Sequence, residues 1–111
     1  MLTYAQALAL AESWLRIVHG DWLLIVQDRT IKKPYGWVFF YNSKKFLETR
    51  DNRDRIAGNA PIIVDRINGE IRVTGTARKI EHYLAEYEAT IPSARLLLEL
   101  PDDPLVEQRG S

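Results

Sequence analysis

The sequence predicts an α+β domain in which an N-terminal helix and a second helix accompany an antiparallel sheet of about five strands. Apolar residues recur at helical spacing near the N-terminus and again over residues 76–88. Between these helices, short apolar and β-branched runs follow one another with brief connections, which favours an antiparallel meander over βαβ units. We expect the second helix to pack on the sheet, because one helix or both must cover its apolar face.

The chain length indicates one domain. Its 111 residues are enough to bury a core without disulfides or metals. We assign residues 1–91 to this domain and residues 92–111 to a C-terminal extension, because the helical and strand signals weaken after Pro92. The end of the extension, residues 101–111, contains two prolines and several charges, which predicts that it is partly flexible.

The charge balance and the lack of cysteine exclude several classes of protein. The 15 lysines and arginines equal the 15 acidic residues, so the chain lacks the basic excess of general nucleic-acid or membrane-surface binders. Without cysteine there is no disulfide scaffold, thiol nucleophile or common structural zinc site, which fits a reducing cytoplasm. The sequence shows no signal peptide and no apolar run that could span a bilayer. We therefore expect a cytoplasmic protein with no nucleic-acid or membrane partner.

The first helix is predicted over residues 3–18. Thr3 followed by Gln6 has the pattern of a capping box, and Gly20 suits the positive-φ position that ends a helix. One apolar stripe runs along the segment and consists of Tyr4, Ala7, Leu8, Ala11, Trp14, Leu15 and Val18. This stripe is the face that should pack on the sheet.

Three strands are predicted in the first half of the sheet. The first, residues 22–28, lacks alternation, so both of its faces should be covered. Residues 29–35 are interpreted as a polar connection and residues 36–41 as a strongly aromatic second strand. Residues 44–50 alternate and suit a half-exposed third strand.

Residues 57–71 contain the strongest local signals in the chain. A β-branched run, Ile62-Ile63-Val64, predicts a buried strand over residues 61–66. Asn68-Gly69 is the dipeptide that best suits a type I′ hairpin turn, because both central residues need positive φ. We therefore expect the chain to return over residues 70–74 as a fifth strand.

The second helix is predicted over residues 76–88, with Thr76 as its N-cap. Its expected buried face consists of Ile80, Tyr83, Leu84 and Tyr87. Residues 93–100 suit either a short helix or an edge strand, and their three consecutive leucines do not decide between the two.

No catalytic, metal or cofactor site is predicted. His19 and His82 have no metal-ligand partner at useful spacing, so both are interpreted as structural or surface residues. The serines lie in none of the nucleophile motifs. The run Gly58-Asn59-Ala60-Pro61 lacks the lysine and the following helix of a phosphate loop. We expect that the protein is not an enzyme.

Aromatic residues alternate along the predicted strand 36–41. Trp37, Phe39 and Tyr41 share one face, and Val38 and Phe40 share the other. Core packing is the preferred interpretation of this row. The alternatives are base stacking in an RNA-binding sheet and anchors of a protein interface, which leaves a homodimer open.

The most charged segment, residues 44–55, mixes both signs. Such a run is usually a solvated face, but arginine is enriched at protein interfaces and complementary charge speeds association. The preferred interpretation of residues 58–61 is a tight turn into the next strand, and the alternative is a rigid, exposed loop that presents Asn59 to a partner. The candidate partner-binding residues are Glu48, Arg50, Asp51, Arg53, Asp54, Arg55 and Asn59.

Several segments, taken in order, resemble the immunity protein 35 family, also called YrhB-type domains. They are Gly-Trp-Val-Phe-Phe-Tyr at 36–41, Phe-Leu-Glu-Thr at 46–49, Ala-Gly-Asn-Ala-Pro-Ile-Ile-Val-Asp at 57–65, Asn-Gly-Glu-Ile at 68–71, Gly-Thr at 75–76 and Ile-Glu-His-Tyr-Leu-Ala-Glu-Tyr-Glu at 80–88. The opening Leu-Thr-Tyr-Ala-Gln-Ala at 2–7 also fits. The likeness covers about residues 2–89 and leaves residues 92–111 outside it.

The resemblance implies a small bacterial cytoplasmic protein that binds and neutralises a cognate polymorphic toxin encoded beside it. It also implies a protein that is not enzymatic and needs no cofactor. One branch of the family is described as chaperone-like, so a holdase that binds unfolding proteins is the alternative. The matching residues are mostly turns and core, so they predict the fold better than they predict a contact surface.

Overall fold

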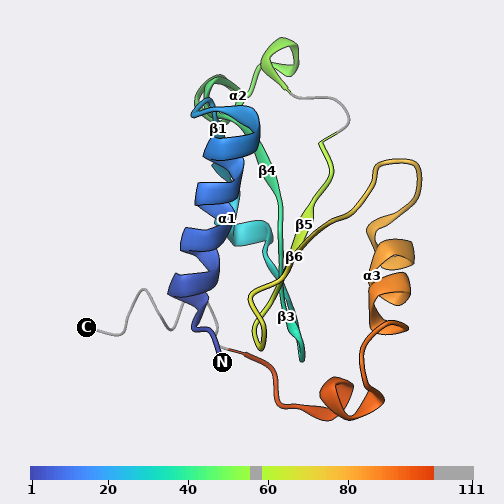
Figure 1. The fold of residues 1–111 in the computed structure, drawn as a ribbon. Coiled ribbons are helices and arrows are strands. Elements are labelled where there is room, and N and C mark those ends of the chain that lie inside the picture. The colour runs from blue at the N-terminus through green and yellow to red at the C-terminus, as the bar shows by residue number, and fades with distance from the viewer. Residues whose placement is uncertain (56–58, 102–111) are drawn as a thin grey trace.

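The computed structural model describes residues 1–55 and 59–101 and has three layers (Figure 1). Helix α1 (Tyr4–His19) covers one face of the sheet, and helix α3 (Ile80–Glu88) covers the other. The described residues contain six short strands, all paired in antiparallel fashion. The α+β class and the packing of the second helix on the sheet are therefore confirmed.

Four strands form the main sheet in the order β2 (Ile31–Lys33), β3 (Gly36–Phe39), β5 (Ile62–Asp65) and β6 (Ile71–Val73). The two central strands are buried along their whole length. They are neighbours in space, although the chain leaves the sheet between them and returns. That excursion places the charged segment 44–55 beyond one end of the sheet.

The remaining two strands extend this sheet. Strand β1 (Leu23–Ile25) pairs with β4 (Tyr41–Ser43), which continues directly from β3. The Val26 N–H donates to the carbonyl of the residue between β3 and β4 at 2.8 Å, so the ladder is nearly continuous. The 3₁₀ turn Gln27–Arg29 is inserted between β1 and β2, which therefore form one interrupted edge strand.

The prediction that residues 29–35 only connect two strands is wrong, because they contain β2. Pro34 and Tyr35 make a tight turn into β3, and Gly36 follows with φ +153°. A Cβ at Gly36 would lie 2.0 Å from the Val64 carbonyl oxygen. Only glycine allows the two strands to approach this closely.

The prediction that both faces of the first strand are covered is also wrong. The side chain of Leu24 is 43% exposed, whereas Leu23 and Ile25 are buried. Strand β1 lies at the sheet edge, where α1 covers one face and solvent contacts the other.

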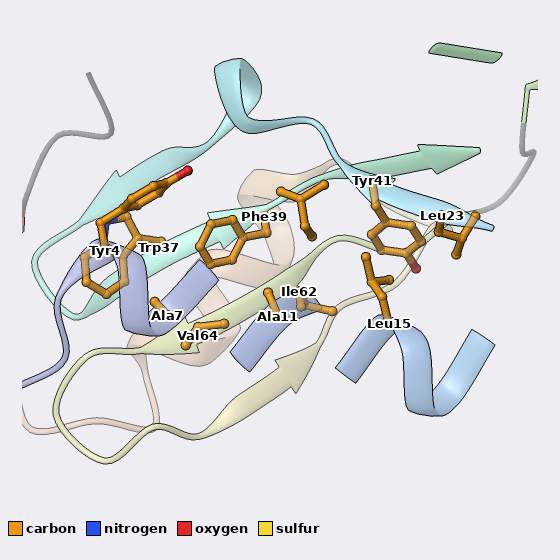
Figure 2. Packing of buried hydrophobic residues seen from close by; sticks show 11 residues of the cluster. Tyr4, Ala7, Ala11, Leu15, Leu23, Trp37, Phe39, Tyr41, Ile62 and Val64 are labelled. Carbon is orange, nitrogen blue, oxygen red and sulfur yellow. The ribbon is translucent and has the colours of Figure 1, made fainter. Parts of the chain in front are cut away.

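The predicted capping box of α1 is present. Thr3 Oγ1 accepts from the Gln6 N–H at 3.2 Å, and Gln6 Oε1 accepts from the Thr3 N–H at 2.9 Å. Six of the seven predicted stripe residues pack on the sheet side of the helix (Figure 2). The prediction is wrong for Val18, which is 54% exposed near the end of the helix. The core on this side contains Tyr4, Ala7, Ala11, Leu15, Leu23, Ile25, Trp37, Phe39, Tyr41, Ile62 and Val64.

A second core lies between the sheet and α3. It contains Tyr35, Val38, Ile63, Leu84 and Tyr87. The alternating strand 36–41 thus supplies both cores, with its aromatic row facing α1. Burial of Trp37 and Phe39 at 0% exposure confirms core packing, and the base-stacking alternative is wrong because no aromatic face in this row is free to stack.

The predicted third strand over residues 44–50 is wrong, because this segment forms helix α2 (Lys44–Thr49). Ser43 caps it by accepting from the Phe46 N–H at 2.9 Å, and Arg50 ends it in the left-handed conformation with φ 57°. Lysine, leucine and glutamate also favour a helix. Alternation over seven residues was therefore a weaker signal than the capping serine.

The second helix begins at Ile80 with Lys79 as N-cap, so the prediction of a start at Thr76 is wrong. The backbone N–H of Arg78 donates to the Tyr83 hydroxyl at 3.1 Å, which holds the preceding segment back against the helix. Gly75 permits this approach, because a Cβ there would lie 2.5 Å from the Tyr83 hydroxyl oxygen.

The turn between β5 and β6 lies where Asn68 and Gly69 predicted it, but type I′ is wrong. Gly69 has φ +72°, whereas Asn68 does not have positive φ. Asp65 and Glu70 form the last backbone pair, which leaves a four-residue loop. The Asp65 carboxylate caps this loop by accepting from the Ile67 N–H at 2.8 Å.

The C-terminal segment folds back across the molecule. Residues Ser93–Leu97 form a 3₁₀ helix, which decides between the helix and strand left open by the sequence. Leu96 packs on the core below α3. The Arg66 guanidinium donates to the Glu99 carbonyl at 2.8 Å, which brings residue 99 beside the start of α1, since the Leu2 N–H donates to the Arg66 carbonyl. Most of the tail predicted to be flexible, residues 102–111, lies outside the described part.

Candidate functional site: a charged ridge

The charged segment 44–55 forms a ridge at one end of the sheet, which we call the charged ridge. It consists of α2 and the 3₁₀ turn η2 (Asn52–Asp54). Figure 1 shows η2 projecting from the body of the molecule beyond β4. The chain reaches the ridge from β4 and afterwards returns to the sheet centre as β5.

A buried serine fixes the base of the charged ridge. The side chain of Ser43 accepts from the Phe46 N–H and donates to the Asp54 carbonyl at 2.6 Å. Asp54 itself accepts from the Thr49 hydroxyl at 2.9 Å and pairs with Lys45 at 3.6 Å. These bonds tie η2 onto α2, so the ridge is an ordered surface.

The outer side of the ridge presents paired charges. Arg53 Nη2 lies 2.7 Å from Asp51 Oδ2, and Asp51 also caps the Arg53 N–H at 2.9 Å. Hydrogen bonds from Arg53 hold the pKa of the Asp51 carboxyl below its ordinary value. The Arg50 guanidinium lies 5.7 Å from the Phe46 ring centre, in cation–π range. Glu48 and Arg55 are exposed on the same segment.

Asn59 does not stand out on an exposed loop. It is half-buried, and its side-chain amide donates to the Tyr41 carbonyl, so it links the chain after the ridge to β4. It also lines an open groove of about 530 Å³, together with Phe40, Pro61 and Arg78. The structure therefore brings six of the seven candidate residues together on the ridge and places Asn59 below it.

Sequence analysis missed a buried polar cluster centred on Asp65. Asp65 has 0% exposure and accepts from the Tyr87 hydroxyl at 2.7 Å and from Arg95 with both carboxylate oxygens. Burial by itself would raise the pKa of Asp65, but the hydrogen bonds from Arg95, Tyr87 and the Ile67 N–H outweigh it, and the net pKa is lowered.

The cluster continues to a second tyrosine. The Tyr35 hydroxyl donates to Glu88 at 2.9 Å, and its ring lies 5.3 Å from that of Tyr87. Burial, together with nearby carboxylates, raises the pKa of both tyrosines. The Asp65 carboxylate is paired with Arg95 and accepts from Tyr87, so we interpret the cluster as structural. The one sequence signal was an aspartate ending an apolar strand immediately before a turn.

The two histidines pack against neighbouring side chains. The His19 ring lies 5.4 Å from that of Trp14, and His82 Nε2 lies 3.6 Å from Glu86. In the part of the chain that the structure describes, no three histidine or acidic side chains gather closely enough to hold a metal ion. Nor does any helix in residues 1–55 and 59–101 have the length and apolar character needed to cross a bilayer.

Comparison with known proteins then decides the family. The family profile named Immunity protein 35 matches residues 5–90. The chain belongs to the immunity protein 35 family. Among its relatives is the Uncharacterized protein YrhB of Escherichia coli strain K12, which is 40% identical over 88 residues, covering 79% of this chain and 90% of that protein. No solved structure matches the chain.

The family match covers the charged ridge and only part of the Asp65 cluster. The charged ridge and Asp65 both lie within the matched region, but Arg95 lies beyond residue 90. The ion pair that closes the C-terminal segment thus joins a residue inside the family match to one outside it.

Proposed function

We propose that this protein is a cytoplasmic immunity protein that binds a cognate toxin and blocks its active site. Membership in the immunity protein 35 family is the observation that carries this proposal. The protein acts by binding and supplies no catalytic group of its own. Its partner is a protein toxin rather than a nucleic acid or a membrane, in keeping with a net charge of zero.

The charged ridge is the proposed docking surface. Its side chains are ordered by the bonds from Ser43, Asp54 and Asp51 before any partner arrives. Preordered side chains lose little entropy on binding, so more of the contact energy appears as affinity. The ridge also projects beyond the sheet (Figure 1), a shape that suits insertion into a substrate cleft.

Arg50 and Arg53 are the proposed anchors of this interface, with Glu48, Asp51, Asp54 and Arg55 around them and Asn59 holding the base. Arginine is enriched among residues that dominate binding energy. Arg50 is exposed at the C-terminal end of α2, with its guanidinium 5.7 Å from the Phe46 ring centre. Its exposure leaves it accessible to a partner's surface.

The test uses the toxin domain encoded beside this gene in its source genome. Its affinity for the full chain is measured by titration calorimetry, together with rescue of toxin-inhibited growth. The double variant Arg50→Glu, Arg53→Glu should weaken binding by at least about tenfold, or about 1.4 kcal/mol, and leave the thermal midpoint nearly unchanged.

The control reverses two exposed charges before α3, Arg78→Glu and Lys79→Glu, which should keep wild-type affinity and rescue. Equal affinity of the ridge variant and the control would move the docking surface elsewhere. Failure of the wild-type chain to bind or to protect would overturn the immunity function itself.

A chaperone-like holdase is the second candidate function. The observation that favours it is the exposure of large apolar side chains, including Ile17 at 83% and Leu97 at 86%, since a holdase needs apolar surface to hold unfolded chains. Suppression of heat aggregation of a model client at equimolar ratio would support it. Clients that aggregate as fast with the protein as without it would exclude it.

A further inference from the structure

The solvent-facing side of α1 carries almost no charge. The exposed residues of this helix are Ala5, Gln6, Ala9, Leu10, Arg16, Ile17, Val18 and His19. Arg16 is the one lysine, arginine or acidic residue among them. The shorter helix α3, by contrast, exposes Glu81 and Glu86. An exposed helix face with a single charged residue is unusual for a solvated surface and is typical of a contact surface.

This face of α1 combines a protrusion and a hollow. Ile17 protrudes with 83% of its side chain exposed. An open hollow of about 330 Å³ lies nearer the N-terminus of the helix, lined by Leu2, Gln6, Ala9, Leu10 and Ser13. Ile17 follows Leu10 by seven residues, so both lie on the same side of the helix.

The apolar surface continues sideways onto the sheet edge. A Cβ at Gly69, in the β5–β6 loop, would lie 3.9 Å from Leu10, so this side of α1 faces β6. Ile71 packs on the α1 core, and Val73, two residues on, shares its face of the strand with 48% exposure. Val73 therefore extends the uncharged surface beyond the helix.

We propose that this face binds a second copy of the chain, with the two α1 helices antiparallel about a two-fold axis that passes near Ser13. Ile17 lies eight residues from Ala9 at the centre of the hollow, or about 12 Å along the helix. An axis halfway between them, at Ser13, places Ile17 of each copy in the hollow of its partner. A self-complementary patch of this kind is what a two-fold dimer requires.

Size and charge agree with a second copy as the occupant. The helix is about 24 Å long. Together with Val73, the uncharged surface on α1 is about 20 Å wide, or twice the width of a helix. Such a strip on each copy buries on the order of 1,000 Å² in total, near the lower limit for a specific interface. A chain with zero net charge has no overall repulsion to oppose the contact. We expect a weak dimer, with a dissociation constant of about 1–100 µM.

Sedimentation velocity of the full chain from about 1 to 500 µM tests the association. The wild-type mass should rise with concentration from that of the 12.8 kDa monomer toward twice that value. Ile17→Glu should weaken association at least tenfold. The matched control Leu97→Glu changes an equally exposed apolar residue, at 86%, and should behave as wild type. A wild-type chain that stays monomeric throughout, or equal behaviour of the two variants, would overturn the proposal.

Single cysteines test the arrangement of the helices, because the chain contains no cysteine. Ser13→Cys lies near the proposed axis and should form a disulfide-linked dimer on mild oxidation. Ala5→Cys lies eight residues from the axis, so its two copies would be about 24 Å apart and should not crosslink. Crosslinking at both positions, or at residue 5 alone, would rule out the antiparallel pairing.

Discussion

Removal of the Arg95 guanidinium would leave the most deeply buried charge in the described structure without its cation. Asp65 has 0% exposure, and Arg95 contacts both of its carboxylate oxygens. In the variant Arg95→Met, the carboxylate keeps only the Tyr87 hydroxyl, at 2.7 Å, and backbone N–H groups of the β5–β6 loop. An uncompensated buried charge is among the costliest defects that a single substitution can create.

The magnitude follows from the burial of the pair. Breaking a buried ion pair costs about 3–5 kcal/mol. The Arg95 side chain keeps 18% exposure, and its buried Nε has no hydrogen-bond partner among the described residues. Both facts place the cost at the lower end, about 3 kcal/mol. For a domain of this size such a loss lowers the thermal midpoint by about 12–24 °C.

Urea denaturation at pH 7 measures this loss, and Arg66→Met provides the matched control. Arg66 is adjacent to Asp65 in sequence and also reaches the C-terminal segment, through the Glu99 carbonyl. It pairs with no buried charge among the described residues, so its replacement should cost less than about 1 kcal/mol. A loss of less than 1 kcal/mol in Arg95→Met would refute the assignment of the pair as a main support of the C-terminal segment.

The pH dependence provides an independent check of the cause. The pKa of Asp65 is lowered in the folded protein, so its stabilising effect is present above the unfolded pKa of about 3.9 and is lost as pH falls below it. Without Arg95, burial should raise the pKa of Asp65 instead, and protonation would then relieve the buried charge. The difference in free energy of unfolding between wild type and Arg95→Met should therefore become smaller from pH 7 to pH 3. A difference that stays constant with pH would show that lost packing, and not the unpaired charge, causes the loss of stability.

Three further predictions concern single positions and ionisation. Gly36→Ala should unfold the domain or cost more than about 3 kcal/mol, because its Cβ would fall 2.0 Å from a backbone oxygen of β5; a soluble variant with a wild-type urea midpoint would contradict this. Ser43→Ala should lower the free energy of unfolding by about 1–2 kcal/mol, since it removes both the cap of α2 and the bond to η2. An unchanged free energy of unfolding, even with a weaker far-UV helix signal, would contradict this prediction. The raised pKa values of Tyr35 and Tyr87 mean that stability is full below the unfolded pKa of about 10 and falls as pH rises above it. Absorbance at 295 nm should then show these two tyrosines ionising only as the protein unfolds, and full ionisation of all tyrosines near pH 10 in the folded state would refute it.

Local sequence signals determined the elements whose stabilising contacts are close along the chain. The capping box at Thr3 and Gln6, the stripe of α1, and the alternating strand from Trp37 all appear in the structure where the sequence predicts them. Each depends on spacings of two to four residues, which the sequence shows directly. The family and the α+β class follow from the same segments.

Contacts that no short sequence pattern reveals decided the remaining elements. Strand β2 exists because β3 pairs with it. Helix α3 starts late, at Ile80, and the backbone N–H of Arg78 before it donates to the side-chain hydroxyl of Tyr83. The segment after Ser43 is helix α2 rather than a strand, and the buried Ser43 hydroxyl ties it to η2 by donating to the Asp54 carbonyl.

The pairing of Asp65 with Arg95 crosses 30 residues, and the β5–β6 loop lies beside Leu10 of α1 although more than 50 residues separate them. The spacing of apolar residues in the sequence determines which face of each helix or strand can be buried. Which of those faces were buried against other elements, and which stayed exposed, depended on the packing of the whole chain, because burial and pairing are properties of neighbours in space.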